Sequence, residues 1–317
     1  MSFLGRLPML LNPTTLHSFL RTTPPTKLTV LDTTWHLPTA GRPPALSEYL
    51  AGPRIPTARF FDLDVHCDHA TTLPHMLPSA GDFAATCRHL GIYKDSLVVL
   101  YDNSHPVGVR ASCRVWWTLR AFGFPKEQIA VLNGGLAGWI KEGLDVESTR
   151  LTEADVQAHA TQSADPNVFG TRFFEPELQT DLIRTMDQVA QRIAQGAATI
   201  VDARPPGRFA GRDPEPRPGI ESGHMPGAFN VPSSSVLDAD GKFKSTGELR
   251  ALFAPALKDL CADESAKKDL IASCGSGVTA AVLAFALEYA GLAKDVSVYD
   301  GSWSEWAAKG GEIVKDA

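Results

Sequence analysis

The chain contains 317 residues, of which 44% are hydrophobic and 21% are charged. This length and balance suit a globular protein with room for two domains of ordinary size. The net charge of −6 argues against a surface built for nucleic-acid backbones or anionic lipids. No apolar stretch is long enough to cross a bilayer, and no secretory signal is evident. We therefore expect an intracellular protein that binds neither membranes nor, directly, nucleic acid.

The first 21 residues contain Arg6 and Arg21 but no acidic side chain, which is compatible with a mitochondrial transit segment. The leucines of the same stretch are, however, typical of the start of a folded domain. We expect the protein in the cytoplasm, with the mitochondrion as the alternative.

Short β-branched runs alternate with amphipathic stretches along the first half. A short run at residues 30–32, in which two apolar residues precede an aspartate, is followed by an apolar run at 97–101, and residues 114–122 then have the pattern of a helix. Strands buried on both faces of a parallel sheet have such continuous apolar runs. The alternation predicts an α/β domain with a largely parallel sheet flanked by helices.

The second half of the chain repeats the first at an offset of roughly 170 residues. The matched segments, first half then second, are 30–32 and 200–202, 41–42 and 211–212, 55–58 and 225–228, 97–102 and 269–274, and 131–135 and 298–302. Each copy then ends with a matched tryptophan, Trp139 or Trp306. These order-preserving matches predict two tandem α/β domains.

The boundary between the two copies falls in a polar segment that includes residues 161–167. We place the N-terminal domain at residues 8–147, a linker at 148–177 and the C-terminal domain at 178–315.

Cys274 lies between an apolar run at 269–272 and a helical pattern at 280–289. Backbone N–H groups of a small-residue loop and the positive end of a following helix can stabilise a thiolate. This placement predicts a nucleophile, and the alternative is a buried structural cysteine beside a glycine-rich turn. Asp102 takes its place in the first half, and an aspartate cannot carry a transferable sulfur. The sequence therefore predicts one active site, in the second half.

The remaining cysteines are Cys67, Cys87, Cys113 and Cys261. An odd total without a CxxC pair argues against a disulfide framework. We expect Cys87 and Cys113 to be buried and Cys67 and Cys261 to have no redox role.

A group of side chains at His66, Cys67, His69 and His75 invites interpretation as a metal site. The group lacks an established zinc spacing, and partners that would complete a tetrahedral shell are not apparent. We expect no metal there.

The motifs resemble those of tandem-domain sulfurtransferases of the rhodanese superfamily, and most closely the subclass that uses 3-mercaptopyruvate. The resemblance covers nearly the whole chain and is carried by residues 75–78, 114–117, 201–204, 223–228, 274–279 and 298–303. It implies two tandem rhodanese-like domains, each a parallel β-sheet flanked by helices. It also implies an active site between the halves and no cofactor.

The subclass depends on the two residues after the cysteine. Thiosulfate enzymes of this family usually have Arg and Lys there, whereas this chain has Gly275 and Ser276. A loop without fixed cations suits a monoanionic keto acid better than a doubly charged donor. The resemblance therefore implies transfer of sulfur from 3-mercaptopyruvate through a Cys274 persulfide to a thiol or cyanide, with release of pyruvate. A thiosulfate sulfurtransferase is the runner-up.

The resemblance also assigns residues to the substrate. It implies that Arg208 and Arg217 hold the carboxylate and keto oxygen, the alternative being surface arginines of a proline-rich loop. Ser276, Asp64 and His75 resemble a proton relay, the alternatives being a turn or cap residue for Asp64 and a structural histidine for His75. The other substrate-binding residues of the cysteine loop are Gly275, Gly277, Val278 and Thr279.

Phosphatases related in fold have an arginine six positions after the cysteine to hold phosphate oxygens. That position is Ala280 here. Without the guanidinium a phosphoryl transition state would be poorly stabilised, so phosphatase activity is not expected.

A non-enzymatic binding or regulatory module is a further alternative, because single rhodanese domains can have such roles. The combination of Cys274, Arg208 and Arg217 argues against it for the whole chain.

The resemblance suggests acceptors but does not choose among them. Thioredoxin, a small thiol, cyanide, or a rhodanese-domain protein that feeds tRNA thiolation would each fit. Because a two-domain chain completes its own active site, we expect a monomer.

Overall fold

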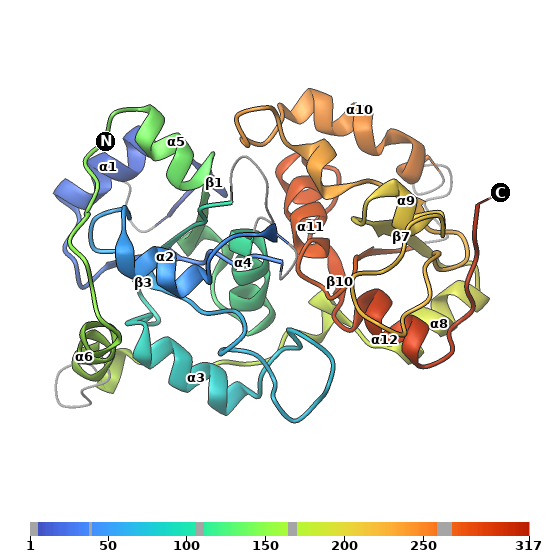
Figure 1. Cartoon of the computed structure of the whole chain (residues 1–317), viewed down its shortest axis with the longest axis horizontal. Coiled ribbons are helices and arrows are strands. Elements are labelled where there is room, and N and C mark those ends of the chain that lie inside the picture. The colour runs from blue at the N-terminus through green and yellow to red at the C-terminus, as the bar shows by residue number, and fades with distance from the viewer. Residues whose placement is uncertain (1–5, 38–39, 105–110, 164–169, 259–267, 317) are drawn as a thin grey trace. The chain divides into compact units, whose positions relative to one another are not determined.

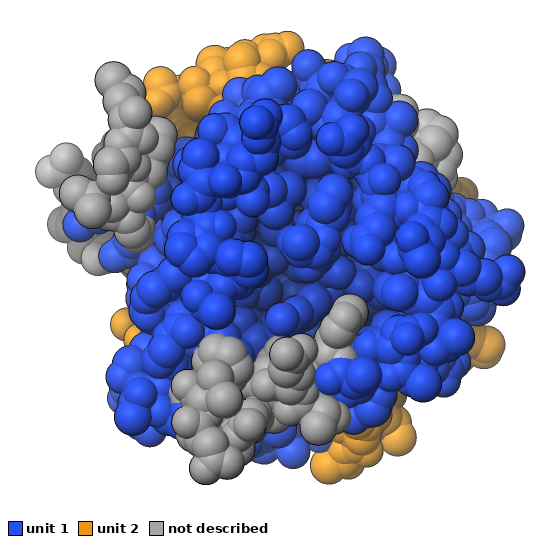
Figure 2. Space-filling model, turned by 90° about the vertical axis from the view of Figure 1, so that its left-hand side faces the viewer, with its two compact units in different colours: residues 1–68, 78–178, 239–242 blue, residues 69–77, 179–238, 243–317 orange. Residues whose placement is uncertain are grey.

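The structure is a computed structural model that describes residues 6–37, 40–104, 111–163, 170–258 and 268–316, with the backbone only at 159–163. The described chain divides into two compact units, which Figure 1 draws as a ribbon and Figure 2 colours separately. Unit 1 consists of residues up to Asp68, of Pro78–Leu178 and of Ala239–Lys242. Unit 2 consists of His69–Leu77, Gln179–Asp238 and the residues from Phe243 onward.

Unit 1 is an alternation of short strands and helices. Its elements are β1 (Leu10–Leu11), α1 (Pro13–Thr22), β2 (Leu28–Asp32), α2 (Ala45–Ala51), β3 (Arg59–Phe60), α3 (Ala80–His89), β4 (Leu97–Tyr101), α4 (Ala111–Ala121), η2 (Lys126–Gln128), β5 (Ile129–Leu132), α5 (Gly135–Lys141), α6 (Glu153–Ser163) and η3 (Gly170–Arg172). The five strands are parallel and lie in the order β1-β5-β4-β2-β3.

Unit 2 has the same alternation. Its elements are η4 (Thr180–Leu182), β6 (Ile183–Arg184), α8 (Met186–Ala194), β7 (Ala198–Asp202), α9 (Pro206–Phe209), β8 (Phe229–Asn230), η5 (Ser233–Val236), α10 (Thr246–Leu257), β9 (Asp269–Ser273), α11 (Ala280–Tyr289), β10 (Ser297–Tyr299) and α12 (Ser302–Ala308). Its parallel strands lie in the order β6-β10-β9-β7-β8.

The two strand orders are identical, and the pairing register agrees as well. Asp32 lies opposite Tyr101 in unit 1, and Asp202 lies opposite Ser273 in unit 2. The next residues along β4 and β9 are Asp102 and Cys274, which are therefore structurally equivalent. The duplication read from the sequence and the predicted fold class are confirmed.

Both sheets are covered by helices on both faces. Right-handed crossovers between parallel strands place a helix on one face when the chain moves one way across the sheet and on the other face when it moves back. In unit 2 the connection from β6 to β7, which contains α8, crosses the sheet in one direction. The connections from β8 to β9 and from β9 to β10, which contain α10 and α11, cross it in the opposite direction. Helix α8 therefore lies on one face of the sheet, and α10 and α11 lie on the other. The packing agrees, since α8 contacts α12 and α10 contacts α11.

The cores contain the aliphatic strand residues together with tryptophans. Trp139 is fully buried in the core of unit 1, and Trp303 and Trp306 lie in the core of unit 2. Cys87 and Cys113 are fully buried, as predicted. Cys261 lies outside the described residues. No helix in the described part of the chain is long and apolar enough to cross a membrane.

Candidate active site

The loop that carries Cys274 begins where β9 ends and leads into α11. Cys274 is 2% exposed. Its N–H donates to Ser302 Oγ at 3.2 Å, and its carbonyl accepts from the Trp303 N–H at 2.9 Å. These bonds hold the cysteine at the carboxyl edge of the sheet, where β9 and β7 meet and the direction of the chain across the sheet reverses. Open parallel sheets bind their ligands at this switch point.

The rest of the loop consists of small, mostly buried residues. Gly277 has φ +76°, a left-handed conformation that suits glycine. Val278 is buried, and Thr279 precedes the first residue of α11 without a side-chain cap. Cys274 therefore lies close in sequence to the positive end of a ten-residue helix, whose dipole favours an anion.

The predicted pair of Ser276 and His75 is brought together. His75 Nδ1 lies 3.1 Å from Ser276 Oγ, and both residues are buried. The histidine comes from the first half of the sequence, but its segment belongs to unit 2. The N–H of Leu77 in the same segment donates to Asp300 Oδ2 at 2.9 Å. His75 adopts φ +61°, a conformation that costs a non-glycine residue about 1 kcal/mol or more and that the surrounding contacts must hold.

Both predicted arginines approach the cysteine loop at Gly275. A Cβ atom at this glycine would lie 3.0 Å from Arg208 Nη2 and 3.9 Å from Arg217 Nη1. Arg217 Nη1 also lies 3.5 Å from Ser304 Oγ, and that hydroxyl donates to the Gly275 carbonyl at 2.6 Å. The guanidinium groups thus reach the residue next to Cys274, where glycine leaves them room.

A buried ionic framework holds Arg208 in this position. Glu215 Oε2 accepts from both Arg208 Nε, at 3.1 Å, and Arg208 Nη2. The other oxygen of Glu215 accepts from Arg204 Nη1 at 2.9 Å. Arg204 also donates to Asp202 from Nε and Nη2 and stacks over Trp303 at 4.2 Å. Glu215 is therefore shared by a buried arginine and by the arginine beside the loop.

Arg204 is charged in spite of its burial. Desolvation disfavours the charged guanidinium, but Asp202 and Glu215 outweigh it and raise the pKa of Arg204 above its usual value. A buried charge of this kind is tolerated because it is paired with two carboxylates and all three of its nitrogens donate hydrogen bonds.

The third predicted relay residue, Asp64, lies in unit 1. Both of its carboxylate oxygens accept from the indole N–H of Trp35, at 3.0 and 3.1 Å. Its part in a relay with Ser276 and His75 stays a prediction.

Several residues of the site, among them Glu215, Ser302 and Asp300, had no role in the sequence analysis. Ser302 and Asp300 lie inside the motif at residues 298–303, and Asp300 binds the His75 segment. Glu215 lies between the two predicted arginines, Arg208 and Arg217. Ser302 has φ +49°, and its counterpart in unit 1 is Gly135 with φ +57°. A glycine at the matching position of the other copy is the signal that could have identified the special backbone of Ser302.

The described residues contain no group of three or more His, Cys, Asp or Glu side chains arranged to hold a metal ion. The site consists instead of a loop cysteine, a hydroxyl–imidazole pair and two arginines. This set is suited to nucleophilic attack by a thiolate on a small anionic substrate.

Comparison with known proteins agrees with this class. The family described as "Rhodanese-like domain" matches residues 185–309. The chain is 40% identical to thiosulfate/3-mercaptopyruvate sulfurtransferase 1, mitochondrial, of Arabidopsis thaliana, over 89% of this chain and 72% of that protein. It is 37% identical to 3-mercaptopyruvate sulfurtransferase of Homo sapiens, over 88% of this chain and 84% of that protein.

A solved structure supports the same relationship. The Tum1 protein of Saccharomyces cerevisiae matches with a TM-score of 0.80 and 31% identity, over 98% of this chain and 99% of that one. The chain belongs to the rhodanese superfamily of sulfurtransferases, and it is an enzyme of that class, as its motifs indicated.

Proposed function

We propose that the enzyme transfers the sulfur of 3-mercaptopyruvate through a persulfide on Cys274 to a thiol or to cyanide. The observation that carries this proposal is the convergence of Arg208 and Arg217 on Gly275, next to a buried cysteine at the sheet's switch point. The two relatives described above have 3-mercaptopyruvate in their names.

The first half-reaction forms one S–S bond and breaks one C–S bond. The Cys274 thiolate attacks the thiol sulfur of 3-mercaptopyruvate, and the electrons of the C–S bond stay with carbon as the enolate of pyruvate. Protonation of that carbon gives pyruvate. In the second half-reaction an acceptor thiolate takes the outer sulfur and regenerates the Cys274 thiolate, so no redox cofactor is required.

The two arginines would bind the donor's carboxylate and keto oxygen. The guanidinium fork binds such oxygens with paired hydrogen bonds, and its charge stabilises an enolate that develops negative charge on the same oxygen. Glu215 would act as a positioning residue for Arg208, because it already binds two of that arginine's nitrogens. Gly275, Gly277, Val278 and Thr279 would form the loop around the reacting sulfur.

Ser276 would move the proton that this chemistry requires. Its hydroxyl lies 3.1 Å from His75 Nδ1, within reach of a hydrogen bond. We include Asp64 as the third member of this relay, on the strength of the family resemblance. A relay is useful for 3-mercaptopyruvate, whose leaving carbon must be protonated, and is not needed for thiosulfate, which leaves as sulfite.

The acceptor and the cellular setting are further parts of the proposal. We propose a thiol acceptor such as thioredoxin, with a rhodanese-domain protein of tRNA thiolation as an alternative. We also propose that the chain acts as a monomer in the cytoplasm or, like the relative from Arabidopsis thaliana, in the mitochondrion.

The first experiment compares 3-mercaptopyruvate with thiosulfate as donors, with cyanide as acceptor, for the wild type, Ser276→Ala and His75→Asn. We expect a preference for 3-mercaptopyruvate, and a loss of about 10- to 1,000-fold in that reaction in both variants. Turnover of thiosulfate should change much less.

Asp64→Asn is measured in the same assay, because the relay predicts a similar selective loss. A thiosulfate preference in the wild type would retain the nucleophile but overturn the donor. Equal losses with both donors would remove the proton relay from the mechanism.

A further inference from the structure

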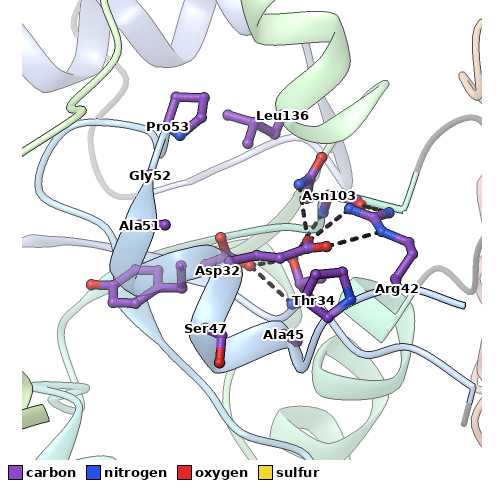
Figure 3. Close-up of a pocket in the computed structure, with 13 residues that line it drawn as sticks. Asp32, Thr34, Arg42, Ala45, Ser47, Ala51, Gly52, Pro53, Asn103 and Leu136 are labelled. Carbon is purple, nitrogen blue, oxygen red and sulfur yellow. Dashed lines mark hydrogen bonds and ion pairs between the residues drawn. The ribbon is translucent and has the colours of Figure 1, made fainter. Parts of the chain in front are cut away.

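Unit 1 contains a pocket of about 320 Å³ at the carboxyl edge of its sheet (Figure 3). Its lining includes Asp32, the last residue of β2, and Thr34, which follows that strand. It also includes Asn103, which follows β4. Pro53 and Leu136 lie across the pocket from Asp32 and Thr34. The pocket therefore lies at the switch point of unit 1, the position that corresponds to the cysteine loop and its arginines in unit 2.

The two units differ at this point in the size of two equivalent side chains. Thr34 corresponds to Arg204, because each backbone N–H donates to the aspartate two residues earlier, at 3.0 and 2.9 Å. Leu136 corresponds to Trp303, because each N–H donates to the carbonyl of the residue that follows the central strand, at 3.0 and 2.9 Å. Both residues are smaller in unit 1, so they leave open the space that the side chains of Arg204 and Trp303 occupy in unit 2.

In unit 2 that space holds a guanidinium group. Arg204 donates to Asp202 Oδ2 from Nε at 3.0 Å and from Nη2 at 2.6 Å, and also from Nη2 to the Gly223 carbonyl at 2.7 Å. Trp303 covers the face of the guanidinium at 4.2 Å. The fold thus builds a complete receptor for a planar cation and fills it with its own arginine.

Unit 1 retains the central carboxylate of this receptor, whereas Ala45 stands at the position of Glu215, which accepts from Arg204 Nη1 in unit 2. Asp32 is the counterpart of Asp202 and is 3% exposed, and Pro53 stands at the position of Gly223. Among the described residues, no Lys, Arg or His lies within ion-pair distance of Asp32, whose carboxylate accepts instead from the N–H and hydroxyl of Thr34 and from the hydroxyl of Tyr101. Burial raises the pKa of Asp32 to about 6, so it is ionised at pH 7.5.

The other charged groups of the pocket neutralise each other. Arg42 donates to Glu48 from Nε at 3.1 Å and from Nη2 at 2.7 Å, and from Nη1 to the Asn103 carbonyl at 2.6 Å. Asp32 is therefore the acid whose charge remains uncompensated. A ligand that enters this pocket gains most if it brings a positive charge to that carboxylate.

We propose that this pocket of unit 1 is a binding site for a small guanidinium or amidinium compound, whose planar cation takes the place that Arg204 occupies in unit 2. Such a cation can donate two parallel hydrogen bonds to Asp32, as Arg204 does to Asp202. A compact ammonium ion lacks this geometry and should bind more weakly. The proposal is independent of the sulfur donor, because the catalytic cysteine is in the other unit.

The experiment is calorimetric titration of the full chain with methylguanidinium chloride at pH 7.5, with methylammonium chloride at equal ionic strength as the comparison ligand. We expect one saturable site for methylguanidinium in the wild type, with at least about tenfold weaker binding of methylammonium. Thr34→Arg, which supplies the missing side chain, should abolish binding, whereas Thr34→Ser, which keeps the hydroxyl and leaves the space open, should retain it.

Asp32→Asn removes the charge without changing the shape and should weaken binding at least about tenfold. This variant carries the test alone if Thr34→Arg does not fold. The absence of saturable binding in the wild type would overturn the proposal. Undiminished binding in Asp32→Asn would overturn it too, because the cation would then bind elsewhere.

Discussion

The two units have the same sheet and different chemistry at its switch point. After the central strand, unit 1 has Asp102, which accepts a hydrogen bond from the Ser112 hydroxyl at 2.6 Å, and unit 2 has Cys274. After the neighbouring strand, unit 1 has Thr34 beside an open pocket, and unit 2 has Arg204 in a buried ionic framework. The sheet thus fixes the position at which a site can form, whereas a few side chains at the strand ends decide whether that site can catalyse a reaction.

The largest expected effect concerns the two residues that follow the central strands. Cys274→Ser should lower sulfur transfer from 3-mercaptopyruvate at least about 1,000-fold, or about 4 kcal/mol of transition-state stabilisation, because the hydroxyl is a poor nucleophile and cannot form a persulfide. Asp102→Asn, which can still accept from Ser112, should leave the rate within about twofold. A comparable loss in both variants would mean that unit 1 takes part in the chemistry. Steady-state kinetics checks both.

The equivalent aspartates should respond oppositely to neutralisation. Asp202→Asn leaves Arg204 buried with one of its two carboxylate partners gone, so we expect a loss of about 3 kcal/mol in unfolding free energy at pH 7.5. Asp32→Asn removes a buried carboxylate that has no such partner and should be neutral or stabilising. Urea and thermal unfolding of the full chain measure the difference. Equal destabilisation by the two substitutions would contradict it.

The pH dependence of stability sharpens the same contrast. The pKa of Asp32 is about 6 in the folded chain and 3.8 as its ordinary value, so the folded state binds the proton more tightly. Protonation of Asp32 therefore stabilises the folded state, and this stabilisation is complete at low pH and is lost as the pH rises through about 6. The difference between the two pKa values corresponds to about 3 kcal/mol of unfolding free energy. Between pH 4.5 and 7.5, Asp32→Asn should therefore gain about 2 kcal/mol of unfolding free energy relative to the wild type, because part of the full difference already lies below pH 4.5.

Arg208 should matter more than an arginine of the same segment that makes no contact with the loop. Arg208→Ala should reduce kcat/KM for 3-mercaptopyruvate about 10- to 100-fold, the cost of a charge-assisted hydrogen bond to the donor. Arg212→Ala is the matched control, because Arg212 is exposed, and it should change kcat/KM less than twofold. If the two variants behave alike, Arg208 does not bind the donor.

The smallest expected effect is at Ser302, where unit 1 has Gly135. Ser302→Gly loses the hydrogen bonds to the Cys274 N–H and the Tyr299 carbonyl but relieves a left-handed conformation. The two terms oppose each other at about 1 kcal/mol each, so the unfolding free energy should change by less than about 1 kcal/mol. A much larger loss, measured by urea unfolding, would mean that the serine hydroxyl outweighs the strain.

Much of the fold could be predicted because its signals are local or repeated. The strand expected at residues 97–101 is β4, and the helix expected at 114–122 is α4, Ala111–Ala121. The equivalence of Asp102 and Cys274 followed from the repeat alone, because the matched segments on both sides have similar spacing in the two copies and allow only one alignment of the strands. The class of enzyme came from the resemblance of motifs in both halves to the rhodanese superfamily, because the cysteine loop alone is also compatible with a buried structural cysteine.

The sequence by itself determined the duplicated sheet and the class of the enzyme, and it predicted a single nucleophile and the arginines that accompany it. Only the tertiary structure decided that His75, 201 residues before Ser276, belongs to the unit of the cysteine. The structure likewise decided that Glu215 connects Arg204 to Arg208, and that Thr34 and Leu136 line a pocket where their counterparts, Arg204 and Trp303, stack on each other. The physical reason is that hydrogen bonds, ion pairs and empty volume depend on distances between side chains remote in sequence, which no local pattern records.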